Sequence, residues 1–246
     1  MSYFIVFAGK GGTGKSTLAA LTVRYLREKK LMPVLAVDAD PNFCLPELLG
    51  ISSFETLAEI RDNALNSKPE GMSLDEWLEI ELNRIVEESE GFDLLVMGRP
   101  EGSGCYCAVN NVLKRILQEI SEQYKYIVID NEAGMEHISR GIVNKIDLLF
   151  IIGTPAKSSL QAALRINELS KELNLSPERR ILVINQATEK LEEHRIFSSY
   201  FEKVSYLCFD EEIKRISEKG GSIFSLKNHS SVIRDFYSLL EEEIGR

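Results

Sequence analysis

Long apolar runs are missing from this sequence of 246 residues. No stretch approaches the roughly 18 to 20 consecutive apolar residues that a membrane-spanning helix needs. An excess of positive charge is missing as well, because 29 basic residues stand against 38 acidic ones and give a formal net charge of −9. We therefore expect no broad basic surface for nucleic acid or anionic lipids. The first ten residues, MSYFIVFAGK, lack the features of a cleavable leader, so a cytoplasmic protein is expected.

Cysteine and histidine are scarce. Four cysteines in a chain of this length do not make the disulfide framework of a small secreted domain, and in a reducing compartment they pack in the core, catalyse or bind metal. The three histidines show no metal-ligand spacing. Two of the cysteines, Cys105 and Cys107, are close enough in sequence to suggest a shared site. The other two, Cys44 and Cys208, stand singly beside apolar neighbours and are expected to be packed.

Hydrophobic residues make up 44% of the chain and occur in short β-branched runs separated by helical segments. The runs predict buried strands at residues 3–8, 33–38, 92–98, 126–130, 148–153, 180–185 and 204–209. Apolar residues recur with the spacing of an α-helix, which predicts helices at residues 15–29, 74–88, 108–123, 158–173 and 230–243. This alternation predicts an α/β fold with a doubly wound, mainly parallel sheet of seven or eight strands, in a single domain over residues 1–246.

Two regions interrupt the alternation. Residues 51–91 form a long, acidic and mainly helical segment, which either carries specificity or covers one edge of the sheet. Residues 99–107, RPEGSGCYC, form a glycine-rich loop after a predicted strand. Open α/β sheets bind their ligands at the carboxyl ends of the strands, so this loop is placed where a ligand would lie.

The segment FAGKGGTGKST contains a phosphate-binding loop pattern, Gly9-xxxx-Gly14-Lys15-Ser16, between a predicted strand and a predicted helix. In such a loop backbone N–H groups surround phosphate oxygens, a lysine neutralises charge, and a hydroxyl reaches Mg²⁺. We expect nucleotide contacts from Gly11, Gly12, Thr13, Gly14, Lys15, Ser16 and Thr17. The alternative is a glycine-rich turn that binds no nucleotide.

Acidic residues end two other predicted strands. Asp130 ends YIVID at the usual position of the carboxylate that orients Mg²⁺, and Asp38 and Asp40 end VLAVDAD. We expect Ser16, Asp38 and Asp130 to surround Mg²⁺, and Asp40 to orient the water that attacks the terminal phosphate. One of the three acids could instead be an ordinary solvated residue at a strand end.

Two further residues are candidates for nucleotide contacts. The backbone N–H of Gly134, in NEAGMEH, would sense the terminal phosphate, unless it only forms a tight turn. Asn185 ends RILVIN and can donate and accept hydrogen bonds at a purine edge, unless it only caps the next segment. The acid typical of guanine sites is absent from Asn185-Gln186-Ala187-Thr188, which favours adenine and therefore ATP.

The sequence GKGGTGKS resembles the deviant Walker A motif of the ParA, MinD and nitrogenase-iron-protein group of P-loop NTPases. The resemblance implies that Lys10 reaches the nucleotide of a partner subunit, so that nucleotide binding and homodimer formation are coupled. It also places Lys10 and Lys15 with Asp40 among the catalytic residues. The alternative is that Lys10 is an ordinary surface lysine.

Within this group, DADPN, GSGCYC and DNEAGMEH look like the CooC-type ATPases that mature nickel carbon monoxide dehydrogenase. The resemblance spans essentially the whole chain and implies a transition metal at Cys105 and Cys107. It also implies an apo carbon monoxide dehydrogenase or acetyl-CoA synthase as the client. Two departures are Asn131, after the Walker B acid, and Cys208, where a proline is common.

The spacing of Cys105 and Cys107 suits a shared metal ion. If the loop is extended, residues two apart point to the same side, so both sulfurs can meet one soft or borderline ion. Two thiolates are half of a four-coordinate site, and a twofold dimer would supply the other half, giving a four-cysteine site for Ni²⁺ or Zn²⁺ between subunits. A helix near residue 108 would lower the thiol pKa values. A strained disulfide and an accidental pairing are the alternatives.

Three functions are compatible with these motifs. The first is an ATP-driven metallochaperone that inserts nickel. The second is a partitioning or positioning switch, but the acidic C-terminal SLLEEEIGR and the net charge argue against binding to membranes or DNA. The third is an electron-transfer protein with an intersubunit iron–sulfur cluster, whose second cysteine would be expected in NEAGMEHIS, where none occurs.

Overall fold

The computed structural model describes the chain except residues 68, 73, 100–105, 133–144, 173–176, 189–196, 228–229 and 246, and the side chains of residues 64–67, 74–75, 78–79, 82–83 and 106–108. Its strands are β1 (Tyr3–Gly9), β2 (Val34–Ala39), β3 (Val86–Ser89), β4 (Phe92–Val96), β5 (Tyr126–Asn131), β6 (Leu148–Gly153), β7 (Arg179–Ala187) and β8 (Lys203–Cys208). Its α-helices are α1 (Lys15–Glu28), α2 (Leu45–Leu48), α3 (Leu57–Ser67), α4 (Leu74–Ile85), α5 (Tyr106–Ile120), α7 (Lys157–Glu172), α8 (Glu211–Lys219) and α9 (Ser231–Ile244), with short 3₁₀ turns at Ser121–Gln123 and Ile223–Ser225.

These strands form one eight-stranded sheet in the order β3-β4-β2-β5-β1-β6-β7-β8. All neighbouring pairs are parallel except β3 and β4, which are antiparallel. The predicted doubly wound, mainly parallel α/β sheet is therefore confirmed. Parallel strands that are covered on both faces must be apolar at successive positions, which is why the sequence shows continuous runs rather than alternation.

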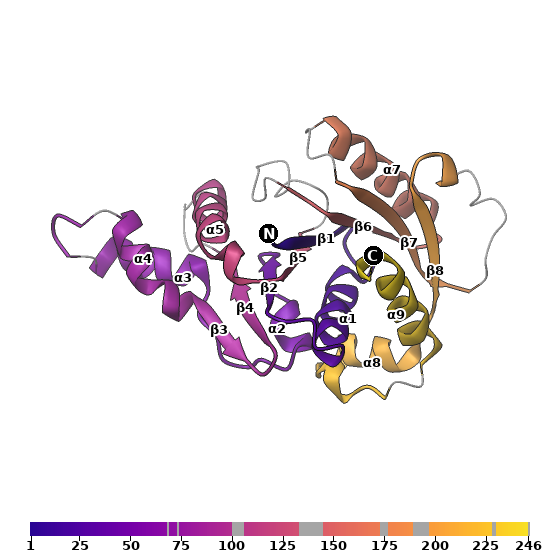
Figure 1. Cartoon of the computed structure of the whole chain (residues 1–246), viewed down its shortest axis with the longest axis horizontal. Helices are drawn as coiled ribbons and strands as arrows, with labels where there is room; N and C mark the ends of the chain where they lie inside the picture. The colour runs from indigo at the N-terminus through magenta and orange to yellow at the C-terminus, as the bar shows by residue number, and fades with distance from the viewer. Residues whose placement is uncertain are drawn as a thin grey trace.

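Helices cover both faces of the sheet (Figure 1). In β1, Ile5 and Phe7 pack on one face with residues of α1, α2, α8 and α9, whereas Val6 and Ala8 pack on the other with residues of α3, α5 and α7. Side chains of a strand alternate between faces, so each strand contributes to two separate cores. The sheet between them is thus held from both sides.

Strand β3 was not predicted, and the expected helix over residues 74–88 was wrong at its C-terminal end. Helix α4 ends at Ile85, and Val86–Ser89 pairs with β4 across a turn at Glu90 and Gly91. Gly91 has a φ of +86°, a conformation that favours glycine and closes the hairpin. Pairing with β3 satisfies backbone groups of β4 that a longer helix would leave without a partner strand, so tertiary contact decides this segment.

The acidic segment 51–91 is mainly helical, as predicted, and it forms the β3 edge of the sheet. Helices α3 and α4 lie beyond this edge in Figure 1, with α3 beside α5. The base of α3 is fixed by a hydrogen bond of 3.0 Å from the Ala58 N–H to the Met97 carbonyl, just after β4. The second of the two expected roles, covering a sheet edge, is therefore observed.

No helix in the described part of the chain has both the length and the apolar character needed to cross a bilayer. The longest described helices, α5 and α7, instead bury apolar side chains against the sheet.

Candidate functional site

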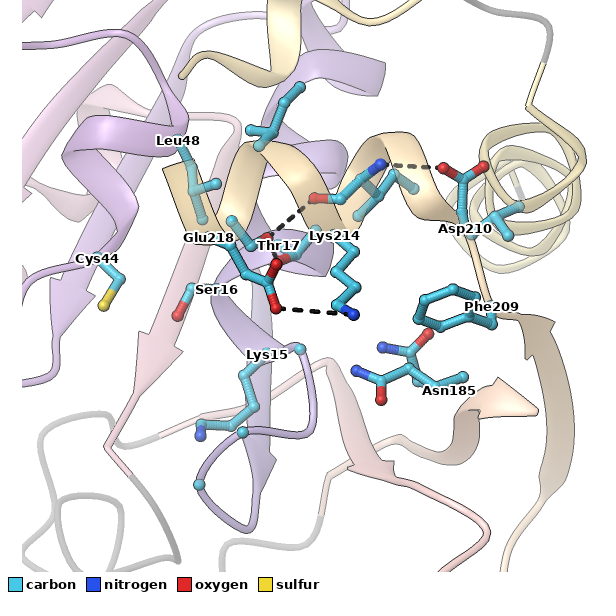
Figure 2. Close-up of a pocket in the computed structure, with 18 of the residues that line it drawn as sticks. Lys15, Ser16, Thr17, Cys44, Leu48, Asn185, Phe209, Asp210, Lys214 and Glu218 are labelled. Carbon is cyan, nitrogen blue, oxygen red and sulfur yellow. Dashed lines mark hydrogen bonds and ion pairs between the residues drawn. The ribbon is translucent and has the colours of Figure 1, made fainter. Parts of the chain in front are cut away.

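A cavity of about 730 Å³ opens at the carboxyl ends of the parallel strands (Figure 2). It is lined by Gly11, Gly12, Gly14, Lys15, Ser16 and Thr17 from the loop and first turn after β1, by Asp40 after β2, by Asn185 from β7, and by residues of α8. Eight of the residues predicted from sequence thus meet in one cavity. Thr13, Asp38 and Asp130 are buried, and Lys10 is exposed outside the lining.

The phosphate-loop backbone requires glycine at Gly14. Its φ is +95°, and a Cβ atom there would lie 2.4 Å from Nδ2 of Asn185. The loop is closed by hydrogen bonds from the Thr13 hydroxyl to the Lys10 carbonyl (2.8 Å) and from the Asn185 amide to the Thr13 carbonyl (2.9 Å). Helix α1 starts at Lys15, so its amide dipoles point towards the cavity, where they favour an anion.

Asp38 and Asp130 occupy register-paired positions on the neighbouring strands β2 and β5 and are fully buried. Asp38 accepts hydrogen bonds of 2.9 Å from the N–H groups of Asp40 and Leu45, so its carboxylate holds the turn that follows β2. Burial and the nearby Asp130 raise the pKa of Asp38 well above its usual value. Two buried carboxylates side by side repel each other when both are ionised, and a nearby positive charge would stabilise the ionised forms.

Asp130 is the less satisfied of the two acids. Neither of its carboxylate oxygens has a hydrogen-bond partner, although the Ser16 hydroxyl beside it lowers its pKa without reaching hydrogen-bond geometry. Burial dominates over Ser16 and Lys15 and raises the pKa of Asp130 to about 7. A divalent cation with its waters would satisfy these oxygens, so Asp130 and Ser16 fit Mg²⁺.

Asp40 is half-buried at the cavity, where its carboxylate accepts hydrogen bonds from the backbone N–H (2.9 Å) and the side-chain amide (3.0 Å) of Asn42. The same turn places Phe43 at φ +36°, where its ring is 41% exposed and contacts Phe54 edge-on. A bulky residue at positive φ costs free energy, so this turn is strained.

Lys10 does not contact the cavity. Its ammonium donates a hydrogen bond of 3.3 Å to the Ser158 hydroxyl in the first turn of α7. Lys15, in contrast, is buried, and its ammonium lies 3.5 Å from the Lys10 carbonyl inside the loop. The two lysines therefore point to different surroundings in a single chain.

Asn185 has only part of its predicted freedom at a purine edge. One N–H of its amide is already donated to the Thr13 carbonyl, which leaves the second N–H and the side-chain oxygen able to face a ligand. The next residue, Gln186, has a φ of +57° within a register shift between β7 and β8. This β-bulge ends regular pairing beside the cavity, as bulges near binding sites often do.

Helix α8 is the part of the cavity that the sequence did not reveal. Lys214, Ser217 and Glu218 line the cavity on the side of α8 that meets the first turn of α1, together with Phe209 before the helix. Asp210 caps α8 by accepting hydrogen bonds from the N–H groups of Glu212 and Ile213. One signal was present, an aspartate before an amphipathic stretch, because such residues start helices.

The prediction for the cysteine pair needs one correction. Tyr106 and Cys107 belong to α5, which begins two residues earlier than expected, so the extended-loop alternation does not apply to Cys107. Cys105 and Gly134 lie outside the described residues. Of the isolated cysteines, Cys44 and Cys208 both line the cavity and are exposed, so the expectation that they are packed was wrong.

Among the described residues, no group of three or more histidine, cysteine, aspartate or glutamate side chains is arranged to hold a metal ion. The predicted nickel or zinc site requires Cys105 and a second chain, so it stays a prediction.

The comparisons agree with this architecture. The family described as CobQ/CobB/MinD/ParA nucleotide binding domain matches residues 4–223. An uncharacterised ATP-binding protein of Methanocaldococcus jannaschii is 34% identical over 98% of both chains. The carbon monoxide dehydrogenase accessory protein CooC of Rhodospirillum rubrum is 29% identical over 90% of this chain and 89% of its own.

A solved structure shows the same fold at lower identity. The septum site-determining protein MinD of Pyrococcus horikoshii, complexed with Mg-ADP, superposes with a TM-score of 0.70 at 20% identity and covers 98% of this chain and 96% of its own. Fold, phosphate loop and sequence similarity lead to one conclusion. The chain belongs to the CobQ/CobB/MinD/ParA nucleotide-binding family and is a P-loop ATPase.

Proposed function

We propose that this ATPase is a cytoplasmic metallochaperone that inserts nickel into an apo carbon monoxide dehydrogenase or acetyl-CoA synthase. ATP closes a homodimer, Cys105 and Cys107 of both chains hold one Ni²⁺ or Zn²⁺, and hydrolysis to ADP opens the dimer and releases the metal. The observation that carries the proposal is the similarity to CooC over nine-tenths of the chain, together with the sequence Cys105-Tyr106-Cys107.

The loop after β1 binds the phosphates in this proposal. The N–H groups of Gly11, Gly12, Thr13 and Gly14 surround the phosphate oxygens, and the N-terminus of α1 adds its partial positive charge. Lys15 neutralises the β- and γ-phosphates, and Thr17 borders the α-phosphate side of the cavity.

Mg²⁺ would neutralise charge that develops on the phosphates when bound. The Ser16 hydroxyl would hold the ion from the loop, and Asp130, whose oxygens have no partner among the described residues, would accept hydrogen bonds from its waters. Asp38 keeps the turn after β2 in place through two backbone N–H groups, so its contribution to the metal is indirect.

Asp40 orients the attacking water, and Gly134 contributes its N–H near the terminal phosphate. In the free chain the Asp40 carboxylate is held by Asn42. Release of this contact would free an oxygen for the water, and the strained position of Phe43 lowers the cost of rearranging the turn.

The nucleotide base is adenine in this proposal. One N–H of the Asn185 amide is donated to Thr13, so its oxygen and its second N–H remain for the base. The oxygen can accept a hydrogen bond from the exocyclic amino group of adenine. The choice of ATP over GTP rests on the absence, after Asn185, of the acid typical of guanine sites.

Metal binding tests the proposal directly. Wild-type chain with ATP and Mg²⁺ is expected to bind about one Ni²⁺ or Zn²⁺ per two chains, because a four-thiolate site takes two cysteines from each. The double variant Cys105→Ser/Cys107→Ser should lose this metal while ATP binding is retained. Inductively coupled plasma mass spectrometry after gel filtration measures the ratio.

The matched control is Cys44→Ser/Cys208→Ser, which removes the two exposed cysteines of the nucleotide cavity and should keep the metal. Unchanged stoichiometry in the Cys105/Cys107 variant would rule out the metal assignment.

A second candidate is an ATP-gated positioning switch without a metal, because the MinD fold covers almost the whole chain. One observation disfavours a membrane role for the C-terminal helix: α9 buries Val232, Ile233, Phe236, Leu239 and Leu240 against the sheet. Co-sedimentation of the ATP-loaded chain with anionic vesicles or DNA, combined with absence of bound metal, would favour this candidate.

A further inference from the structure

Helix α8 is held loosely for an element that forms one wall of the nucleotide cavity. Ile216 is its one buried residue, and its other side chains are exposed or half-buried. The cavity side of α8 carries three polar residues, Lys214, Ser217 and Glu218, beside the apolar Ile213 and Ile216 that pack on the core. Polar side chains on a cavity wall are positioned to select a ligand.

Glu218 is placed between the two ends of the cavity (Figure 2). The hydroxyls of Thr17 and Ser217 lie 3.3 Å apart, which brings α8 against the first turn of α1 next to Glu218. On the other side, Lys214 lies over the Phe209 ring, with 5.6 Å between the ammonium and the ring centroid. Phe209 and Asn185 border the end of the cavity assigned to the base.

The ion pair of Lys214 and Glu218 contributes little to stability. Its atoms are 3.8 Å apart, and the side chains are 46% and 62% exposed. Lysine four residues before glutamate is also the less favourable order on a helix. Exposed pairs of this kind contribute about 0–1 kcal/mol. The pair keeps the Glu218 carboxylate oriented while leaving its oxygens available.

We propose that Glu218 recognises the ribose of the nucleotide, accepting hydrogen bonds from its 2′- or 3′-hydroxyl, and that Lys214 positions it. This assignment rests on the proposed nucleotide site. A carboxylate only accepts hydrogen bonds, and a vicinal diol is the neutral donor group in a nucleotide that lies between phosphates and base. Carboxylates recognise ribose hydroxyls in the same way in dinucleotide-binding sheets.

The chemistry of the other nucleotide groups supports the choice of ribose. A carboxylate repels the phosphates, which lie at the end of the cavity where α1 and Lys15 supply positive charge. The base meets Phe209 and the acceptor oxygen of Asn185 at the opposite end. Glu218 is therefore matched to the sugar between them.

The test compares ADP, 2′-deoxy-ADP and 3′-deoxy-ADP by titration calorimetry with Mg²⁺, because the diphosphates are not hydrolysed. Wild type is expected to bind at least one deoxy analogue about tenfold more weakly than ADP, as for loss of a hydrogen bond to a charged group. Glu218→Ala should bind ADP as weakly as that analogue, with the affinity for the analogue unchanged. Lys214→Met should reduce the discrimination without abolishing ADP binding.

The control is Glu211→Gln, which changes an exposed glutamate of the same helix outside the cavity and should keep wild-type discrimination. Equal wild-type affinity for all three ligands would overturn the assignment, as would an equal loss for all three in Glu218→Ala. Absence of any ADP binding by wild type would overturn the proposed nucleotide site itself, which separates the two failures.

Discussion

Buried carboxylates dominate the chemistry at the residue scale. Asp38 and Asp130 are both inaccessible to solvent, yet they differ in what satisfies them. Backbone N–H groups hold Asp38, whereas the Asp130 oxygens have no partner among the described residues. Buried carboxylate oxygens without hydrogen-bond partners are unusual, and a Mg²⁺ site between the phosphate loop and β5 would explain those of Asp130.

Asp40→Asn is predicted to separate binding from hydrolysis. The amide keeps the size of the side chain but is a poor acceptor for the proton of the attacking water. The turnover of ATP should fall by about 100-fold or more, while ATP affinity changes little. Phosphate release and nucleotide titration on the same preparation measure the two quantities.

Glu47→Gln is the matched control, since Glu47 also lines the cavity and is exposed but is not assigned to hydrolysis. Hydrolysis at the wild-type rate in Asp40→Asn would remove Asp40 from the catalytic role.

Individual residues were predictable where local sequence fixes geometry. Lys15, Ser16 and the loop glycines follow from a strand, a spacing and a helix. The role of Asn185 was only partly predictable, because its hydrogen bond to Thr13 joins residues 172 positions apart. Sequence spacing does not indicate whether the N–H groups or the oxygen of a side-chain amide make such a long-range hydrogen bond.

At the scale of elements, α8 depends on its first residue. Asp210 accepts hydrogen bonds from two N–H groups of the helix and from the Ser230 hydroxyl, which precedes α9. Partial burial raises the pKa of Asp210, but the Ser230 hydroxyl and the two N–H groups outweigh it, so the pKa is lowered overall. One carboxylate thus connects the starts of two helices.

Asp210→Ala is predicted to lower the free energy of unfolding by about 1 kcal/mol near neutral pH, the usual effect of losing a helix N-cap. Because the folded pKa is below the unfolded one, the contribution of the charge is complete above the unfolded pKa. It disappears as the pH falls through the folded pKa, below about 3.9. Urea denaturation at neutral and acidic pH measures both effects.

Asp210→Asn should keep most of the cap, because its oxygen still accepts hydrogen bonds, and should lose the pH dependence. Equal stability of the alanine variant and wild type at neutral pH would show that the cap is unimportant.

Burial made most of the elements predictable, although β8 was also predicted and buries only Leu207. Strands β1, β2, β5 and β6 are buried along nearly their whole length, and their apolar runs identified them. Strand β3 and helix α8 bury few side chains and were missed. The position of β3 depends on pairing with β4 and that of α8 on contact with α1, and no local sequence pattern encodes either contact.

For the whole molecule, the negative charge is unevenly distributed. Residues 51–91 contain eleven acidic and three basic residues, whereas the rest of the chain contains 27 and 26. The acidic segment forms the β3 edge, where α3 lies beside α5 and α4 lies farther out in Figure 1. The rest of the chain has almost no net charge, so two copies could approach each other through surfaces outside residues 51–91 without strong long-range repulsion.

Lys10 connects the single chain to the proposed dimer. In the free chain its ammonium contacts Ser158, an exposed hydrogen bond that is easily exchanged for a phosphate of a second copy. Lys10→Ala should therefore still bind ATP, because Lys15 and the loop N–H groups remain. It should not form ATP-dependent dimers. Ser158→Ala is the control and should dimerise at least as well as wild type.

The most direct test of the account is the oligomeric state in sedimentation velocity, with and without saturating ATP, Mg²⁺ and Ni²⁺. The account predicts that wild type and Ser158→Ala change from one chain to two when the ligands are added, whereas Lys10→Ala stays a single chain with bound nucleotide. A wild-type chain that remains single under these conditions, or dimers of Lys10→Ala at the wild-type level, would contradict it.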